Sequence, residues 1–129
     1  MEVKSKRPLA LPLGGRLHYF RLEALQAVEF ELERRIDDVI ECGADPLNFF
    51  RDLVREAYLV KTPEGFYKND DESVDFLYSD DYDELLRAIF ESADPEQNLA
   101  DFIEAITPSI GKTANTYNIF EDKDKNVQP

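Results

Sequence analysis

His18 is the only histidine and Cys42 the only cysteine of this 129-residue chain, so these two residues limit the chemistry that the chain can perform. A cysteine nucleophile needs a neighbouring base, and a zinc site needs several Cys or His ligands. His18 lies in a short run of alternating side chains, whereas Cys42 ends an apolar helical stripe. We therefore expect His18 to be a surface residue of a β-ribbon and Cys42 to be a core or helix-end residue, with no metal site.

The acidic residues between positions 70 and 84 are the second candidate for chemistry, because no basic residue lies among them. A calcium-binding loop requires a glycine near its centre, and no glycine lies between residues 66 and 110. Such acids either form solvated first turns of helices or dock a basic partner. The second interpretation assigns a partner-binding acidic face to eight residues: Asp70, Asp71, Glu72, Asp75, Asp80, Asp81, Asp83 and Glu84.

Other signatures of enzymes do not occur in the sequence. Gly14 and Gly15 lack the flanking Gly-Lys-Ser/Thr of a phosphate-binding loop and the third glycine of a dinucleotide fingerprint. A hydrolase that uses a carboxylate pair would need two buried acids beside a pocket, and the sequence marks no such pair. We expect a protein that is not an enzyme and that binds no cofactor.

The net charge of −13 is unevenly distributed along the chain. Residues 1–21 carry five basic residues and one acidic residue, whereas residues 62–107 carry two basic and fourteen acidic residues. The total charge disfavours binding to nucleic acid or to an anionic membrane, because both would repel the chain. There is also no apolar run of about 18 residues and no pattern of a signal peptide, so we expect a cytoplasmic protein.

The residues that must position these groups form a short ribbon followed by helices. Gly14-Gly15, between two apolar-rich runs, predicts a β-hairpin over residues 8–21. Leu25, Val28 and later apolar residues at helical spacing predict one helix over residues 22–41. Asp45-Pro46 predicts the start of a helix that ends near Val60.

Further helical signals follow in the acidic half. Acidic residues from Asp70 precede one short apolar run, Asp80 or Asp81 is expected to cap the next helix, and Asp94-Pro95 starts the last one. The fold class is therefore mainly α, with a short N-terminal β-hairpin followed by four to five amphipathic helices. We expect one helical domain over residues 1–108, which includes the ribbon, and an irregular C-terminal tail over residues 109–129.

The N-terminal half resembles the tail assembly chaperones of long-tailed bacteriophages. Residues 13–22 read Leu-Gly-Gly-Arg-Leu-His-Tyr-Phe-Arg-Leu, and the helix that follows has acids such as Glu29 and Glu33 among its apolar positions. The resemblance covers residues 13–33 in residue pattern and residues 9–107 in layout. It implies a non-catalytic scaffold that coats the tape-measure protein and recruits tail-tube subunits in the cytoplasm of the host cell.

The charge pattern is compatible with such a scaffold. A basic ribbon and an acidic helical half attract each other, and this favours head-to-tail association of copies into a homo-oligomer. The ribbon residues expected in self-association are Arg7, Arg16, Tyr19 and Arg21. Two alternatives remain open: an anti-defence protein that mimics DNA with its acids, and a small adaptor that binds one basic partner.

Overall fold

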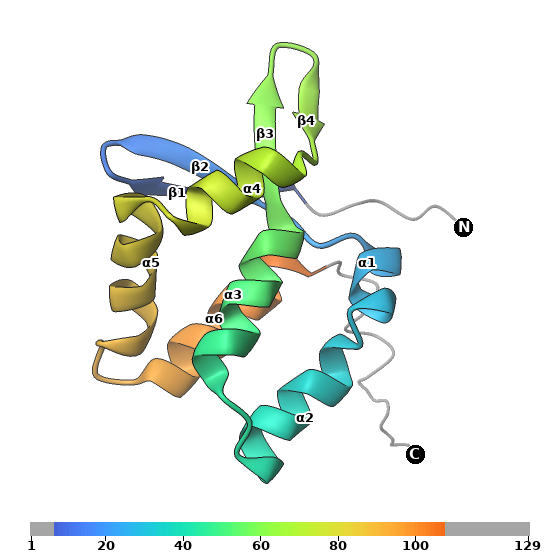
Figure 1. Ribbon diagram of the computed structural model, residues 1–129, viewed down its shortest axis with the longest axis vertical. Coiled ribbons are helices and arrows are strands. Elements are labelled where there is room, and N and C mark those ends of the chain that lie inside the picture. Colours follow the sequence, from blue (N-terminus) through green and yellow to red (C-terminus); the bar gives the residue numbers. More distant parts are fainter. Residues whose placement is uncertain (1–6, 108–129) are drawn as a thin grey trace, which may run out of the picture.

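A computed structural model describes residues 7–107, which form a hairpin followed by helices and a second hairpin (Figure 1). This arrangement confirms the mainly helical class predicted from the sequence. The described residues contain six helices rather than four or five, and their four strands form one sheet. The tail predicted for residues 109–129 lies outside the described residues.

The N-terminal hairpin consists of β1 (Leu9–Leu13) and β2 (Arg16–Phe20), which pair antiparallel. Gly14 and Gly15 form the two-residue turn with φ of 62° and 79°, as predicted, because this turn requires positive φ at both positions. β2 also pairs with β3 (Tyr58–Thr62), so another strand of the same chain supports the hairpin.

The second hairpin joins β3 to β4 (Gly65–Tyr67) and completes the strand order β1-β2-β3-β4. A turn at Pro63 and Glu64 connects these two strands. Only Tyr19 and Phe20 of β2 pair with β3, so β2 has a neighbouring strand on both edges only at its C-terminal end.

The single helix predicted over residues 22–41 is wrong. The chain forms α1 (Ala24–Glu29) and α2 (Leu32–Cys42) instead, and Glu31 interrupts them with a φ of 58°. Cys42 is the last residue of α2, which agrees with the expectation of a helix-end residue rather than a core residue. Gly43 follows it in the left-handed conformation.

Phe30 explains the interruption. Its ring lies 6.1 Å from the ring of Phe49, and the Arg35 guanidinium lies 4.4 Å from the centre of the Phe30 ring. The contact with Phe49, 19 positions later, outweighs the apolar period on which the continuous helix was predicted. Leu25 and Val28, expected in the apolar stripe of that helix, are 66% and 72% exposed.

α3 (Pro46–Ala57) starts where the sequence predicted, with the Asp45 carboxylate accepting a backbone N–H of the first turn. It ends three residues before the expected Val60, because Tyr58 leaves the helix to pair with Phe20 in the sheet. The direct passage from helix to strand fixes the sheet relative to α3.

Three further helices follow, each with a side-chain N-cap. Asn69, Ser79 and Asp94 accept the capping hydrogen bonds. Ser79 rather than Asp80 or Asp81 caps the middle helix, which corrects the sequence prediction. The helices are α4 (Asp70–Leu77), α5 (Asp80–Phe90) and α6 (Pro95–Ile106).

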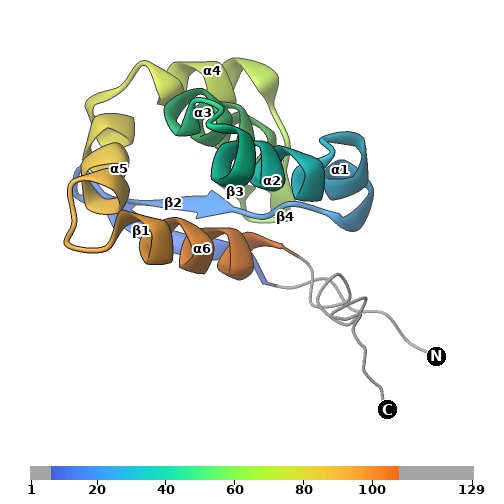
Figure 2. The ribbon, with the colours of Figure 1, turned by 90° about the horizontal axis from the view of Figure 1, so that it is seen from below.

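The core lies around α3, with α2 and α5 on opposite sides of it (Figure 1). Figure 2 shows α3 and α4 in one layer and α6 in another. The fully buried Phe20 ring connects these layers, because it lies 5.7 Å from the rings of both Phe76 on α4 and Phe102 on α6. Burial of one such side chain contributes about 1.5–3 kcal/mol.

Candidate functional site

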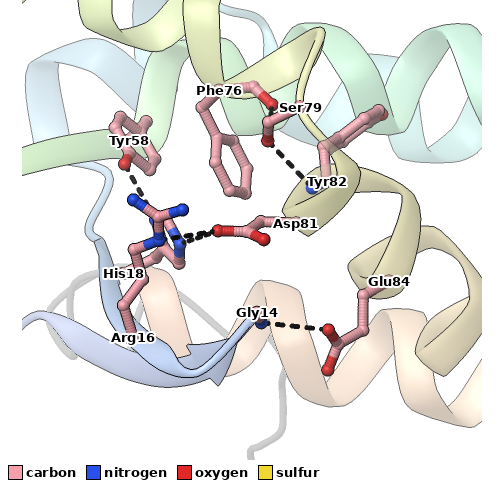
Figure 3. Close-up of polar contacts among 9 residues, drawn as sticks. All are labelled: Gly14, Arg16, His18, Tyr58, Phe76, Ser79, Asp81, Tyr82 and Glu84. Atoms are coloured by element: carbon pink, nitrogen blue, oxygen red, sulfur yellow. Dashed lines mark hydrogen bonds and ion pairs between the residues drawn. The ribbon is translucent and has the colours of Figure 1, made fainter.

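The tip of the β1–β2 hairpin lies against the first turns of α5 (Figure 3). The Gly14 N–H donates to Glu84 Oε1 at 3.0 Å, and Arg16 Nε lies 3.2 Å from Asp81 Oδ2. A Cβ atom at Gly14 would lie 1.8 Å from Asp81 Oδ1, so only glycine permits this approach. The basic ribbon and the acidic segment, expected to attract each other between copies, therefore meet within one chain.

His18 forms the buried part of this junction. Its Nε2 lies 2.8 Å from Asp81 Oδ2, and its Nδ1 lies 2.9 Å from the Tyr58 hydroxyl. A carboxylate accepts hydrogen bonds, so Nε2–H donates to Asp81; in the tautomer that carries its proton on Nε2, Nδ1 accepts from the Tyr58 hydroxyl. Burial raises the pKa of the Tyr58 hydroxyl above 10, and the charge of Glu72 raises it further, so this proton stays available for donation.

The prediction that His18 is a surface residue of the ribbon is wrong, because only 7% of it is exposed. Alternation along β2 puts His18 on the same side as Phe20, and that side faces the core. The ring of Phe76 lies 4.8 Å from the imidazole. The apolar Phe20 two residues away is the signal by which this burial could have been predicted.

We call His18, Tyr58 and Asp81 the His18 cluster. A carboxylate, an imidazole and a phenol in this order can orient one another and transfer a proton. Two surface cavities of the described part, of about 480 and 390 Å³, are lined by other residues. The contacts of His18 join β2, β3 and α5 to one another.

The acidic face predicted from the sequence is divided by this junction. Asp81 is 7% exposed, so the prediction that it belongs to an exposed partner-binding face is wrong. Its neighbour Glu84 is exposed and contacts the hairpin. The other predicted residues are also exposed, and they are Asp70, Asp71, Glu72, Asp75, Asp80 and Asp83.

Two cations reduce the charge of this face. Lys68 Nζ lies 3.6 Å from Asp70, and Arg87 Nε lies 3.1 Å from Asp83. Lys68 is half-buried, with its ammonium donating to Ser73 Oγ at 2.9 Å, and burial lowers its pKa. In residues 7–107 no ion pair joins a cation to the four remaining acids, which are Asp71, Glu72, Asp75 and Asp80.

The ribbon residues proposed for self-association have different environments. Arg7 is exposed, and the Arg16 side chain is 73% exposed although it contacts Asp81. Tyr19 is half-buried against Phe66, at 5.1 Å between ring centres. Arg21 is also half-buried, with its Nε 2.6 Å from Glu23. Among the described residues 7–21, Arg7 and Arg16 are thus the cations that a second molecule can reach.

Among the residues that the structure describes, no group of three or more His, Cys, Asp or Glu side chains has the arrangement of a metal site. Within the same range, no helix is long and apolar enough to cross a membrane.

Comparison with known proteins gave one match. A family model described as phage tail assembly chaperone matches residues 16–126 of this chain. The match begins at β2 and includes every helix described above. No curated protein and no solved structure matches the chain.

Proposed function

The chain belongs to a family of phage tail assembly chaperones, and we propose that it is a non-catalytic scaffold that binds the tape-measure and tail-tube proteins during assembly. The family match over residues 16–126 is the observation that carries this proposal. It covers the end of the basic ribbon, the His18 cluster and the acidic helices together.

The surface supports protein binding through charge. Asp71 and Asp75 are exposed on α4 and lie one helical turn apart, so they share a face. Opposite charges across an interface steer association and select the partner. The proposal assigns this face to a basic surface of one of the two tail proteins.

Co-purification tests the proposal. The tagged full chain is co-expressed separately with the tape-measure protein and with the tail-tube protein encoded in the same genome. We expect both to co-purify with it, and we expect the double variant Asp71→Lys, Asp75→Lys to lose at least one of them. Glu29→Lys with Glu64→Lys changes the net charge equally at exposed sites outside α4, and should retain both.

The four acids without an ion pair also fit the alternative of an adaptor that binds a basic or DNA-binding protein by charge mimicry. Capture of neither tail protein by the unmodified chain would contradict the chaperone proposal. Retention of one DNA-binding protein from the host by a stable monomer would favour the alternative.

A further inference from the structure

An apolar groove of about 480 Å³ lies between α2 and α6, away from the hairpin and the His18 cluster. α2 contributes apolar residues at the helical spacing i, i+3, i+4, α6 contributes Pro95, Leu99 and Ile103 at intervals of four, and the start of α3 completes the groove. The side chain of Ile40 is 73% exposed at its edge. The central residues are Ile36, Val39, Ile40, Phe49, Leu99 and Ile103.

The charged residues beside the groove include Arg35 and Arg87, but both arginines form ion pairs with carboxylates, so the charge that remains there is acidic. Glu96 is the single charged residue that lines it among the described residues. Glu33 and Asp37 precede Ile36 and Ile40 by three positions, so they lie beside them on the surface of α2. Within residues 7–107, no ion pair joins a cation to Glu33, Asp37 or Glu96.

We propose that this groove binds an amphipathic helix of another protein, whose apolar face is flanked by lysine or arginine residues. A third helix laid between α2 and α6 would cover the apolar residues, as in helix-in-groove recognition. Its basic residues would then lie beside the carboxylates on both sides. This inference rests on the proposed function insofar as the helix belongs to a protein that the scaffold binds.

Charge argues against occupation of the groove by a second copy of the chain or by residues 108–129 of the same chain. A second copy could offer the exposed Leu25 and Val28 of α1, but Glu29 lies beside them and would face the acidic groove. Residues 108–129 of the same chain carry three basic and three acidic residues, so they give no net attraction. A basic helix of a different protein fits the groove better, because it is attracted to the acidic residues beside the groove, whereas neither other segment is.

Peptide binding to the full chain tests the inference. The probe is a fluorescent peptide of about 18 residues with leucine at helical spacing and lysine on both flanks, and the reference peptide has glutamate at each lysine position. By anisotropy, we expect the lysine peptide to bind at least about tenfold more tightly, with an advantage that declines in salt. Equal binding of the two peptides would contradict the proposed charge selection.

Two matched variants locate the binding site. Ala100 is an exposed residue in the groove, so Ala100→Trp fills the groove and should weaken binding of the lysine peptide at least about tenfold. Ala88 is exposed on α5 outside the groove, and Ala88→Trp should leave binding unchanged. Equal effects of the two substitutions, with unchanged circular dichroism, would overturn the assignment.

Three outcomes separate this inference from its alternatives. Tighter peptide binding by Ile119→Asp with Phe120→Asp would assign the groove to the chain's own C-terminal residues and overturn the proposal. A dimer that Ala100→Trp abolishes, without any effect on the peptide, would assign it to a second copy. If the Ala100→Trp variant still captures both tail proteins, the inference about the groove is wrong while the proposed function stands. If the unmodified chain captures neither protein, the proposed function itself is wrong.

Discussion

His18 is the residue on which β2, β3 and α5 meet, because its two ring nitrogens contact side chains from the other two elements. A double-mutant cycle of His18→Ala and Asp81→Ala should give a coupling free energy of unfolding of about 2 kcal/mol, as expected for a buried hydrogen bond to a charged group. Chemical denaturation of the four proteins measures this coupling.

The exposed pair Asp83 and Arg87 provides the control for that cycle. It joins residues four apart on the same helix, at 3.1 Å, and both side chains are more than half exposed. Such a pair should couple by about 0.3–0.5 kcal/mol. Equal coupling energies for the two pairs would show that the His18 cluster contributes no more than a surface ion pair.

Tyr82 predicts how stability changes in alkaline solution. Burial raises the pKa of its hydroxyl to about 12, while the unfolded chain loses this proton near 10. Between these values the folded state binds more protons, so this contribution is complete below pH 10 and is lost as the pH rises toward 12. From about pH 9 to 11.5, the free energy of unfolding should fall less in Tyr82→Phe than in the unmodified protein.

Urea denaturation at both pH values measures this difference. Tyr78→Phe is the matched control, because Tyr78 is 88% exposed, and it should lose as much stability as the unmodified protein. An identical decrease in all three proteins would exclude a contribution from burial of Tyr82.

The turn of the β1–β2 hairpin depends on two glycines with different surroundings. In Gly15→Ala the new Cβ atom would have no other atom within 4 Å. The free energy of unfolding should therefore fall only by the strain of positive φ, about 1–2 kcal/mol. Gly14→Ala adds the overlap with Asp81 and should cost at least about 1 kcal/mol more. Thermal denaturation of both variants tests this, and equal losses would mean that the hairpin tip does not lie against α5.

The junction between α1 and α2 carries strain at Glu31, which has a φ of 58°. Glycine adopts this conformation without a steric penalty, so Glu31→Gly should raise the free energy of unfolding by about 0.5–1 kcal/mol. Glu33→Gly, within α2, should instead lower it by about 1 kcal/mol. Opposite signs in chemical denaturation are the expected result, and a loss in both variants would favour a continuous helix.

The elements that could be predicted are those whose signals are local. Asp45-Pro46 and Asp94-Pro95 start helices, and Gly14-Gly15 forms a turn, because the backbone geometry at each site depends on neighbouring residues. Tyr58 begins a strand because Phe20, 38 positions earlier, supplies its partner.

The candidate site shows the same distinction. The exposed acids of α4 follow from composition and helical spacing. The buried Asp81 could not be distinguished from Asp80 in the sequence, because its burial depends on where the β1–β2 hairpin lies in the folded chain. The groove between α2 and α6 was not predicted either, since it requires two helices that are distant in the sequence to line one groove together with the start of α3.

Part of the uneven charge is used in contacts within one molecule. Asp81 and Glu84 contact the hairpin of their own chain, through Arg16 and Gly14. The exposed acids of α4 and the exposed cation Arg7 are not used in this way. The charge that remains for association between molecules is therefore smaller than the sequence totals indicate.

Sedimentation velocity measures what this remaining charge does. If Arg7 and the outer side of Arg16 attract the acidic helices of another copy, the full chain should form oligomers in about 0.01 M salt, where the Debye length is about 30 Å. In about 1 M salt the Debye length is about 3 Å, and the sedimentation coefficient should fall to that of a monomer. Arg7→Glu should shift the low-salt species toward the monomer, whereas Lys61→Glu, an equal change of charge at an exposed site outside the ribbon, should not. A monomer at both salt concentrations would contradict head-to-tail association and would leave the ribbon with its intramolecular contacts to α5 alone.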